Sequence, residues 1–134
     1  MFERIQQIRR ELHQIPELEL ALPKTKAYLV SQLQGLPCQL DFPLESAVTA
    51  FFDNGKATTI AFRSDMDALP VTEQNDVPYR SRHEGKMHAC GHDGHMAMLL
   101  GLAFRLRDLY HELPHNVLLI FQPGEENPGG ARLL

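Results

Sequence analysis

The stretch "NVLLIFQ", residues 116–122, decides the expected fold. It is a nearly continuous apolar run that is bounded by Pro114 and Pro123. A strand that is covered on both faces carries such a run, whereas a half-exposed strand alternates apolar and polar residues. We therefore expect residues 116–122 to form a central strand of a sheet, covered on both faces.

Two β-rich segments precede this strand. They span residues 47–52 and 58–63, and Asp53-Asn54-Gly55-Lys56 lies between them. An Asn-Gly pair adopts positive φ readily, which favours a tight turn between two strands. The two segments are therefore predicted to pair as an antiparallel hairpin.

Three helices complete the expected fold. One should end near Pro16, a second should run from Pro23 to about Gly35, and a third should start with Asp93 as its N-cap. Apolar residues recur at steps of three or four in the first and third: Phe2, Ile5, Ile8, Leu12 and Ile15, then Met96, Leu99, Ala103, Leu106 and Tyr110. This order of elements predicts an α/β domain, a layered mixed β-sheet flanked by helices.

Composition excludes several classes of protein. The 134 residues suit one domain, and a net charge of -4 leaves no excess of basic residues for binding nucleic acid. The longest apolar run, residues 96–104, is too short to cross a bilayer, and the N-terminus lacks the apolar core of a signal peptide. We expect a cytoplasmic protein with no nucleic acid and no membrane partner.

Soft and borderline metal ligands gather after a long loop expected over residues 64–91. His83, His88, Cys90, His92 and His95 lie within thirteen residues. Cys90 and His92 are two apart, so in an extended backbone both side chains face one ion, and thiolate with imidazole suits zinc or a similar divalent metal. The alternative is a polar loop whose histidines only form hydrogen bonds. Cys38 lies between apolar neighbours and is expected to be buried.

Carboxylates follow two of the predicted strands. Glu125 and Glu126 come just after residues 116–122, where binding sites of α/β sheets gather. Adjacent carboxylates repel each other, and a metal removes the conflict if one coordinates it while the other accepts a proton from bound water. The spacing leaves open which does which, and an exposed acidic turn is the alternative. Asp65 or Asp67 could orient a metal-bound histidine, or both could be ordinary turn residues.

Four ordered motifs resemble one known family. They are "RRELHQIPEL" at 9–18, "RSDMDALP" at 63–70, "MHACGHDGH" at 87–95 and "FQPGEENPGGA" at 121–131. Together they resemble the amidohydrolase branch of the M20 metallopeptidases, which includes aminoacylases, hippurate hydrolases and N-acetyldiaminopimelate deacetylases. The resemblance implies a zinc-exopeptidase-like catalytic domain and metal-dependent cleavage of the amide bond in N-acyl amino acids.

The resemblance also implies roles for individual residues. Cys90, His92 and Glu126 would bind a divalent metal, zinc or manganese, and Glu125 would be the general base. Asp67 matches the family's catalytic aspartate near the metal. Family members continue further, with two more histidine ligands and a lid or dimerisation domain. We therefore expect residues 1–134 to be the N-terminal portion of the catalytic domain, incomplete, without the lid, and holding at most one of the family's two ions.

Two other functions stay open at this stage. The chain could be an inactive metal-binding or interaction module that keeps the fold, or a cysteine-dependent hydrolase that uses Cys90 with His92 as base. An unfinished sheet edge tends to pair with another strand, which would allow a homo-oligomer.

Overall fold

A four-stranded mixed sheet organises the molecule. The computed structural model describes residues 1–134, with strands β1 (Gln39–Asp41), β2 (Val48–Phe52), β3 (Thr59–Asp65) and β4 (Asn116–Gln122). Their order across the sheet is β1-β2-β4-β3, so β4 is a central strand as predicted. β4 runs antiparallel to β2 and parallel to β3, which confirms the mixed sheet.

The predicted hairpin between β2 and β3 is wrong, because β4 lies between these strands. The connection still turns, and Gly55 has a φ of +66°. This turn is hydrogen-bonded to the first residue of β4, because the amides of Asn54 and Lys56 donate to Asn116 Oδ1 at 2.8 and 3.2 Å. The Asn-Gly signal is local, and it cannot reveal that a strand distant in sequence separates the two segments.

The two faces of β4 are covered unequally. Val117, Leu119 and Phe121 are buried, and in the sheet register they neighbour the buried residues of β2. Leu118 and Ile120 alternate with them and are only half-buried. The prediction that β4 is covered on both faces is therefore wrong for this structure.

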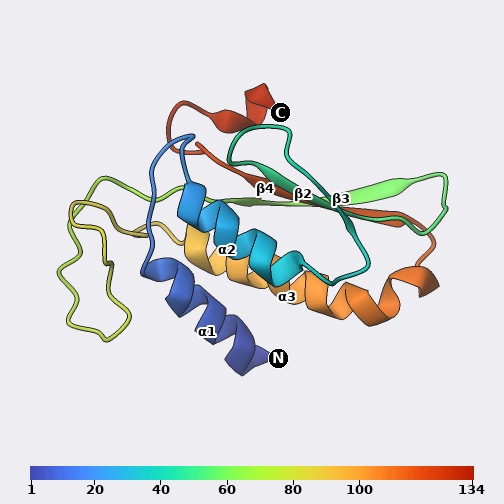
Figure 1. Ribbon diagram of the computed structural model, residues 1–134, viewed down its shortest axis with the longest axis horizontal. Coiled ribbons are helices and arrows are strands. Elements are labelled where there is room, and N and C mark those ends of the chain that lie inside the picture. Colours follow the sequence, from blue (N-terminus) through green and yellow to red (C-terminus); the bar gives the residue numbers. More distant parts are fainter.

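Three helices lie on one side of the sheet (Figure 1). They are α1 (Phe2–His13), α2 (Pro23–Leu33) and α3 (His92–Leu109), followed by the short 3₁₀ helix η1 (Tyr110–Glu112). A second 3₁₀ turn, η2 (Gly130–Leu133), ends the chain. One cluster of 19 buried apolar residues joins α1, α2 and α3 to β2 and β4, so a single core holds the domain together.

The start of α2 is held by a side chain from an earlier segment. α2 begins at Pro23 as predicted, but its N-cap residue Leu22 makes no side-chain cap. The buried carboxylate of Glu17 takes this role, and its Oε1 accepts hydrogen bonds from the amide of Thr25 at 2.7 Å and its hydroxyl at 2.8 Å. The Glu17 carbonyl also accepts the amide of Ala68 at 2.8 Å, which ties this segment to the chain that leaves β3.

α3 begins two residues earlier than predicted. It starts at His92 with Gly91 at the N-cap position, so the assignment of Asp93 as N-cap is wrong. The carboxylate of Asp93 points instead toward α1, where it bonds His13 and Arg9. Long-range ion pairing therefore decides its position rather than capping.

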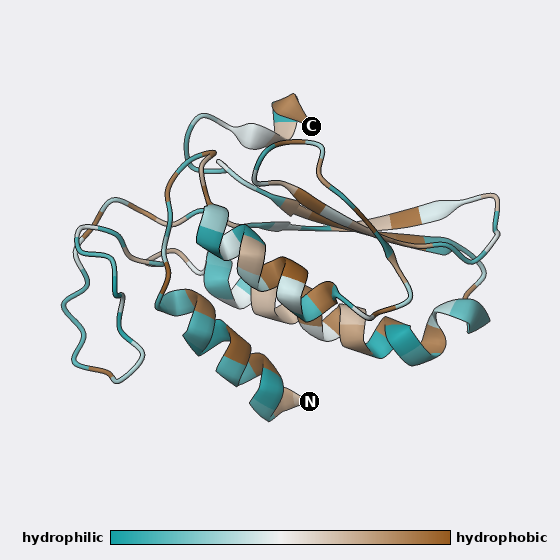
Figure 2. Ribbon diagram, viewed as in Figure 1, coloured by the Kyte–Doolittle hydropathy of each residue, from teal (hydrophilic) through white to brown (hydrophobic).

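A long, mostly hydrophilic loop connects β3 to α3 (Figure 2). It covers residues 66–91, and its one strand-like contact is a bridge between Leu69 and Met87. The loop returns the chain to the end of the sheet that β3 has just left. No helix of the structure is both long enough and apolar enough to span a membrane. Cys38 is half-buried, Cys90 is exposed, and both thiols are free.

Candidate metal centre

The candidate site lies beyond the carboxyl ends of the parallel strands β3 and β4. β3 ends at Asp65 and β4 ends at Gln122, and the two residues are partners in the sheet register. The turns after these strands, together with the start of α3, contribute the functional side chains. The expectation that the candidate residues gather at this rim is therefore met by the topology.

Asp67 joins the turn after β3 to the turn after β4. Its side chain is buried, and its two oxygens accept hydrogen bonds from the amides of Glu125 at 2.9 Å and Glu126 at 3.0 Å. Burial alone would raise the pKa of Asp67, but the hydrogen bonds from His92 and from the two backbone amides outweigh it and lower the pKa. Asp67 is therefore an ionised anchor that fixes the backbone of both glutamates.

His92 is held in one orientation by the chain around it. Its Nδ1 lies 2.7 Å from the carbonyl oxygen of Asp67, to which it donates a hydrogen bond. The neutral ring therefore carries its lone pair on Nε2, the arrangement that metal-binding histidines commonly have. The orienting group is the backbone carbonyl of Asp67, with its carboxylate further away at 3.5 Å.

Three carboxylates surround His92 Nε2. Asp65 Oδ2 lies at 3.3 Å, Glu125 Oε1 at 3.2 Å and Glu126 Oε1 at 3.6 Å. Burial lowers the pKa of His92, but the hydrogen bond to Asp67 and the negative charges nearby outweigh it and raise the pKa to about 9. One proton on Nε2 must therefore balance three carboxylates, which is the electrostatic setting that favours a divalent cation.

Cys90 completes a group of three ligand atoms. Cys90 Sγ, a ring nitrogen of His92 and a carboxylate oxygen of Glu126 all lie within 4.8 Å of one another. The backbone between Cys90 and His92 is not extended as predicted, because Gly91 has a φ of +135°, which glycine tolerates and other residues rarely adopt. Although the Cys90 side chain is exposed, partial desolvation by the surrounding protein and the carboxylates of Glu126, Asp65 and Glu125 raise the pKa of its thiol. A raised thiol pKa is unfavourable for a cysteine nucleophile, because the thiolate is the reactive form. A bound cation would instead lower the thiol pKa.

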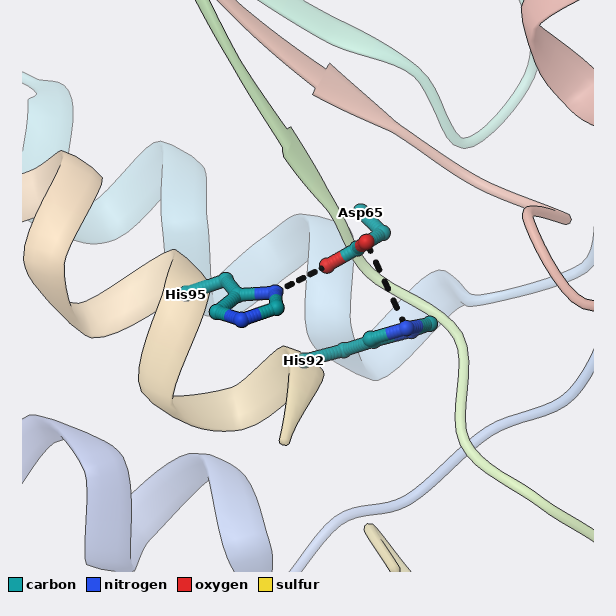
Figure 3. A group of neighbouring side chains, drawn as sticks. All are labelled: Asp65, His92 and His95. Carbon is teal, nitrogen blue, oxygen red and sulfur yellow. Dashed lines mark hydrogen bonds and ion pairs between the residues drawn. The ribbon is translucent and has the colours of Figure 1, made fainter. Parts of the chain in front are cut away.

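A second group of ligand atoms shares His92. Asp65, His92 and His95 also have ligand atoms within 4.8 Å of one another (Figure 3). His95 Nδ1 lies 2.8 Å from Asp65 Oδ1, and the rings of His92 and His95 stack with centroids 5.8 Å apart. The sequence prediction included His95 in the histidine cluster without giving it a role. The spacing of three residues on α3, which places both histidines on one helix face, could have revealed the pair.

The remaining histidines of the cluster, His83 and His88, form no hydrogen bond or ion pair with these carboxylates. His83 Nδ1 bonds the carbonyl of Pro16 at 2.8 Å, and His83 Nε2 lies 3.2 Å from Lys24 Nζ. His88 is buried without a hydrogen bond to the protein, and burial lowers its pKa to about 4. The enrichment in histidine therefore identified the segment that contains the candidate site. Of its histidines, only His92 and His95 lie in the groups of possible metal ligands.

Fold and site together define an α/β protein with a candidate metal centre at the carboxyl ends of its strands. Residues 61–134 match the model of peptidase family M20/M25/M40, which covers more than half of the chain, and the chain belongs to this family. An uncharacterized hydrolase of Staphylococcus aureus (strain bovine RF122 / ET3-1) is 49% identical over 128 residues, which are 94% of this chain and 33% of that protein. The chain therefore spans about a third of the length of such relatives.

Solved structures agree with this assignment. A Bacillus subtilis protein, YXEP, described as a dinuclear metal binding peptidase from the M20 family, superposes with a TM-score of 0.92 at 37% identity, over 98% of this chain and 38% of that chain. The aminobenzoyl-glutamate utilization protein of Klebsiella pneumoniae gives a TM-score of 0.73 at 27% identity, over 96% of this chain and 38% of that chain. The α/β fold predicted from the sequence is thus confirmed as that of part of an M20 peptidase domain.

Proposed function

We propose that these residues belong to a metal-dependent amidohydrolase that cleaves the amide bond of N-acyl amino acids. The convergence of Cys90 Sγ, a ring nitrogen of His92 and a Glu126 oxygen within 4.8 Å is the observation that carries the proposal. Membership of the M20 family and the dinuclear metal named for the B. subtilis neighbour support it. Thiolate, imidazole and carboxylate together suit zinc or manganese, and the excess of carboxylates around His92 fits a divalent cation.

A divalent metal at these three atoms would polarise the amide carbonyl and make water acidic enough to lose a proton near neutral pH. The chain's own residues then hold and move that proton. Glu125 Oε1 lies 3.2 Å from His92 Nε2, and its side chain is 40% exposed, so substrate and water can reach it. Glu125 would accept a proton from water and deliver it to the nitrogen of the leaving amine. Asp67 keeps Glu125 and Glu126 in place through its bonds to their amides.

Two alternatives make different predictions. A metal-binding module without turnover would keep the ion at Cys90 and release no amine under any condition. A cysteine-dependent hydrolase would work without metal and lose activity on alkylation, but the raised pKa of Cys90 disfavours it. Because the relatives are about three times as long as this chain, turnover is proposed for a longer protein that contains these residues. The cytoplasmic location and the absence of a lid from residues 1–134 remain predictions.

Glu125→Gln tests the proposal, because it removes the proton acceptor while nearly keeping the side-chain shape. Amine release from N-acetyl and N-benzoyl amino acids, with added zinc or manganese, should fall by about 100-fold or more in a longer chain that includes these residues. Metal bound by the 134-residue chain, measured by elemental analysis, should not change. Glu112→Gln, an exposed substitution in η1 just beyond the far end of α3, is the matched control. Full activity of the Glu125 variant would overturn the assignment of the base.

A further inference from the structure

A small cavity lies beside Glu126, one of the proposed metal ligands. Its volume is about 140 Å³, and we call it the side pocket. Most of its wall is apolar and comes from Leu18 and from the turn after β3, namely Ala68, Leu69 and Pro70. The side pocket thus offers an apolar surface directly next to the carboxylates of the candidate metal centre.

The segments that form the side pocket are held together although they are distant in sequence. The amide of Ala68 donates to the carbonyl of Glu17 at 2.8 Å, and Asn127 Nδ2 donates to Glu19 Oε1 at 3.2 Å. Glu19 has a φ of +61°, in the left-handed region that residues with a side chain rarely adopt. Such backbone strain collects at binding sites, where the surrounding structure maintains it. The strain at Glu19, which borders the pocket, therefore supports a binding role for this wall.

The position of the side pocket indicates which half of a substrate it faces. In the proposed reaction, Glu125 delivers a proton to the leaving amine, so the amino-acid half of the substrate lies on the side of Glu125. The side pocket borders Glu126 and not Glu125, and so it faces the acyl half. Charge agrees with this orientation. The amino-acid half carries a carboxylate, which Glu19 at the border of the pocket would repel, whereas the acyl half is uncharged.

We propose that the side pocket binds the acyl group of the substrate and accepts apolar acyl groups up to about the size of a benzene ring. This assignment rests on the proposed function, because it names one half of that substrate. An apolar cavity of about 150 Å³ accepts benzene, and the side pocket is of similar volume. A benzoyl group, or an aliphatic acyl group of about six carbons, should therefore fill it, whereas longer chains exceed it.

A series of N-acyl amino acids with increasing chain length measures the size of the pocket. In a longer chain that includes these residues, kcat/KM should rise by about 4-fold for each carbon added from acetyl to hexanoyl, because burial of each CH₂ contributes about that factor. It should fall from hexanoyl to dodecanoyl, for which the pocket has no room. A kcat/KM that rises through dodecanoyl, or that does not depend on chain length, would overturn the proposal.

Substitutions of Leu69 should change the pocket in opposite directions. The Leu69 side chain is half-buried, and the backbone hydrogen bonds of this residue to Met87 do not involve it. Leu69→Phe should lower the ratio of kcat/KM for benzoyl over acetyl substrates by about 20-fold, and Leu69→Ala should move the preferred chain length upward. Leu109→Ala, at an exposed residue at the end of α3, is the matched control and should leave the ratio unchanged. A loss of stability alone lowers both activities together, so an unchanged ratio in the Leu69 variants would contradict the assignment.

Binding of benzamide to the metal-free 134-residue chain tests the pocket without turnover. Benzamide is a neutral carboxamide with an apolar ring, and acetamide is the matched probe without the ring. In ¹H–¹⁵N NMR spectra, benzamide should shift the backbone amide signals of Leu69 and Asn127, and acetamide should not. Leu69→Phe should weaken benzamide binding by about 10-fold or more. Circular dichroism and thermal melting verify that each variant folds.

The outcomes separate this proposal from the proposed function. If the longer chain releases amine but neither the acyl series nor the Leu69 variants show a dependence on size, the side pocket is overturned while the proposed function stands. If no N-acyl amino acid is cleaved although benzamide binds at Leu69, the proposed function fails and the pocket stands as a site for neutral apolar carboxamides. A preference for glycyl over acetyl substrates would also overturn the proposal, because Glu19 would then attract an ammonium group.

Discussion

Two clusters of charged side chains meet at the first turn of α3, and they are built differently. Between α1 and the start of α3, His13 lies between Asp93 at 2.8 Å and Glu73 at 3.0 Å, and Arg9 reaches Asp93 at 3.0 Å. We call these four residues the closed cluster. His13, Glu73 and Asp93 are all buried. Both nitrogens of His13 face carboxylates, an arrangement that favours the doubly protonated ring, and with that ring the charges of the cluster balance.

At the carboxyl ends of β3 and β4, a second group, which we call the open cluster, consists of Asp65, His92, Glu125 and Glu126. Its three carboxylates face one ring nitrogen, and the glutamate side chains are 40% and 33% exposed. Positive and negative charges thus balance in the closed cluster, which joins α1 to α3 and the loop. In the open cluster, which solvent and ions can reach, negative charges are in excess. This difference indicates that the closed cluster supports the fold, and it supports the proposal that the open cluster binds a cation.

The largest predicted effect is on stability, from breaking the closed cluster. His13→Ala removes the one group that bonds both buried carboxylates, and this should lower the free energy of unfolding by about 3–5 kcal/mol. Urea unfolding of the metal-free chain, monitored by circular dichroism, measures the change. A loss below about 1 kcal/mol would show that the cluster does not hold α1 to α3 and the loop.

The pH dependence of this loss is the control. The hydrogen bond to Asp93, together with that to Glu73, raises the pKa of His13 despite its burial. Burial would raise the pKa values of Glu73 and Asp93, but His13 lowers both. The stabilisation that the His13 ring provides is complete below its ordinary pKa of 6.5, and this stabilisation is lost as the pH rises through the raised pKa. The stabilisation that the carboxylates of Glu73 and Asp93 provide is complete above their ordinary pKa values of 4.5 and 3.8. It is lost as the pH falls through their lowered pKa values. The cost of His13→Ala should therefore be greatest between about pH 4.5 and 6.5, and a cost independent of pH would refute the ion pairing.

The smaller predicted effect on stability comes from the open cluster. Glu126→Gln removes one of several like charges near His92, so the stability of the metal-free chain should change by less than about 0.5 kcal/mol. Zinc affinity, measured by competition with a chelator, should instead fall by about 100-fold or more, because a direct ligand is lost and loss of even an outer-shell partner costs about 10- to 100-fold. A large loss of stability without any change in zinc affinity would show that Glu126 is structural.

The sequence predicted what depends on local pattern. The apolar run of β4 and the proline at the start of α2 identified a central strand and a helix. Four motifs predicted that Cys90, His92, Glu125 and Glu126 would gather at one rim, and the topology brings them there, while their chemical roles stay predictions. The strand pairing of β2 and β3 and the N-cap assigned to Asp93 were wrong because distant segments decide both. The Asp65–His95 contact and the closed cluster around His13 were missed for the same reason, since their partners are 30 to 80 residues apart.

X-ray absorption at the zinc edge of the zinc-loaded chain tests the central claim most directly. The account predicts one sulfur neighbour at about 2.3 Å, from Cys90, with nitrogen and oxygen neighbours at about 2.0–2.2 Å. Cys38→Ser should leave this spectrum unchanged, and Cys90→Ser should remove the sulfur. A zinc ion surrounded only by nitrogen and oxygen in the wild-type chain would contradict the claim that Cys90, His92 and Glu126 bind one metal.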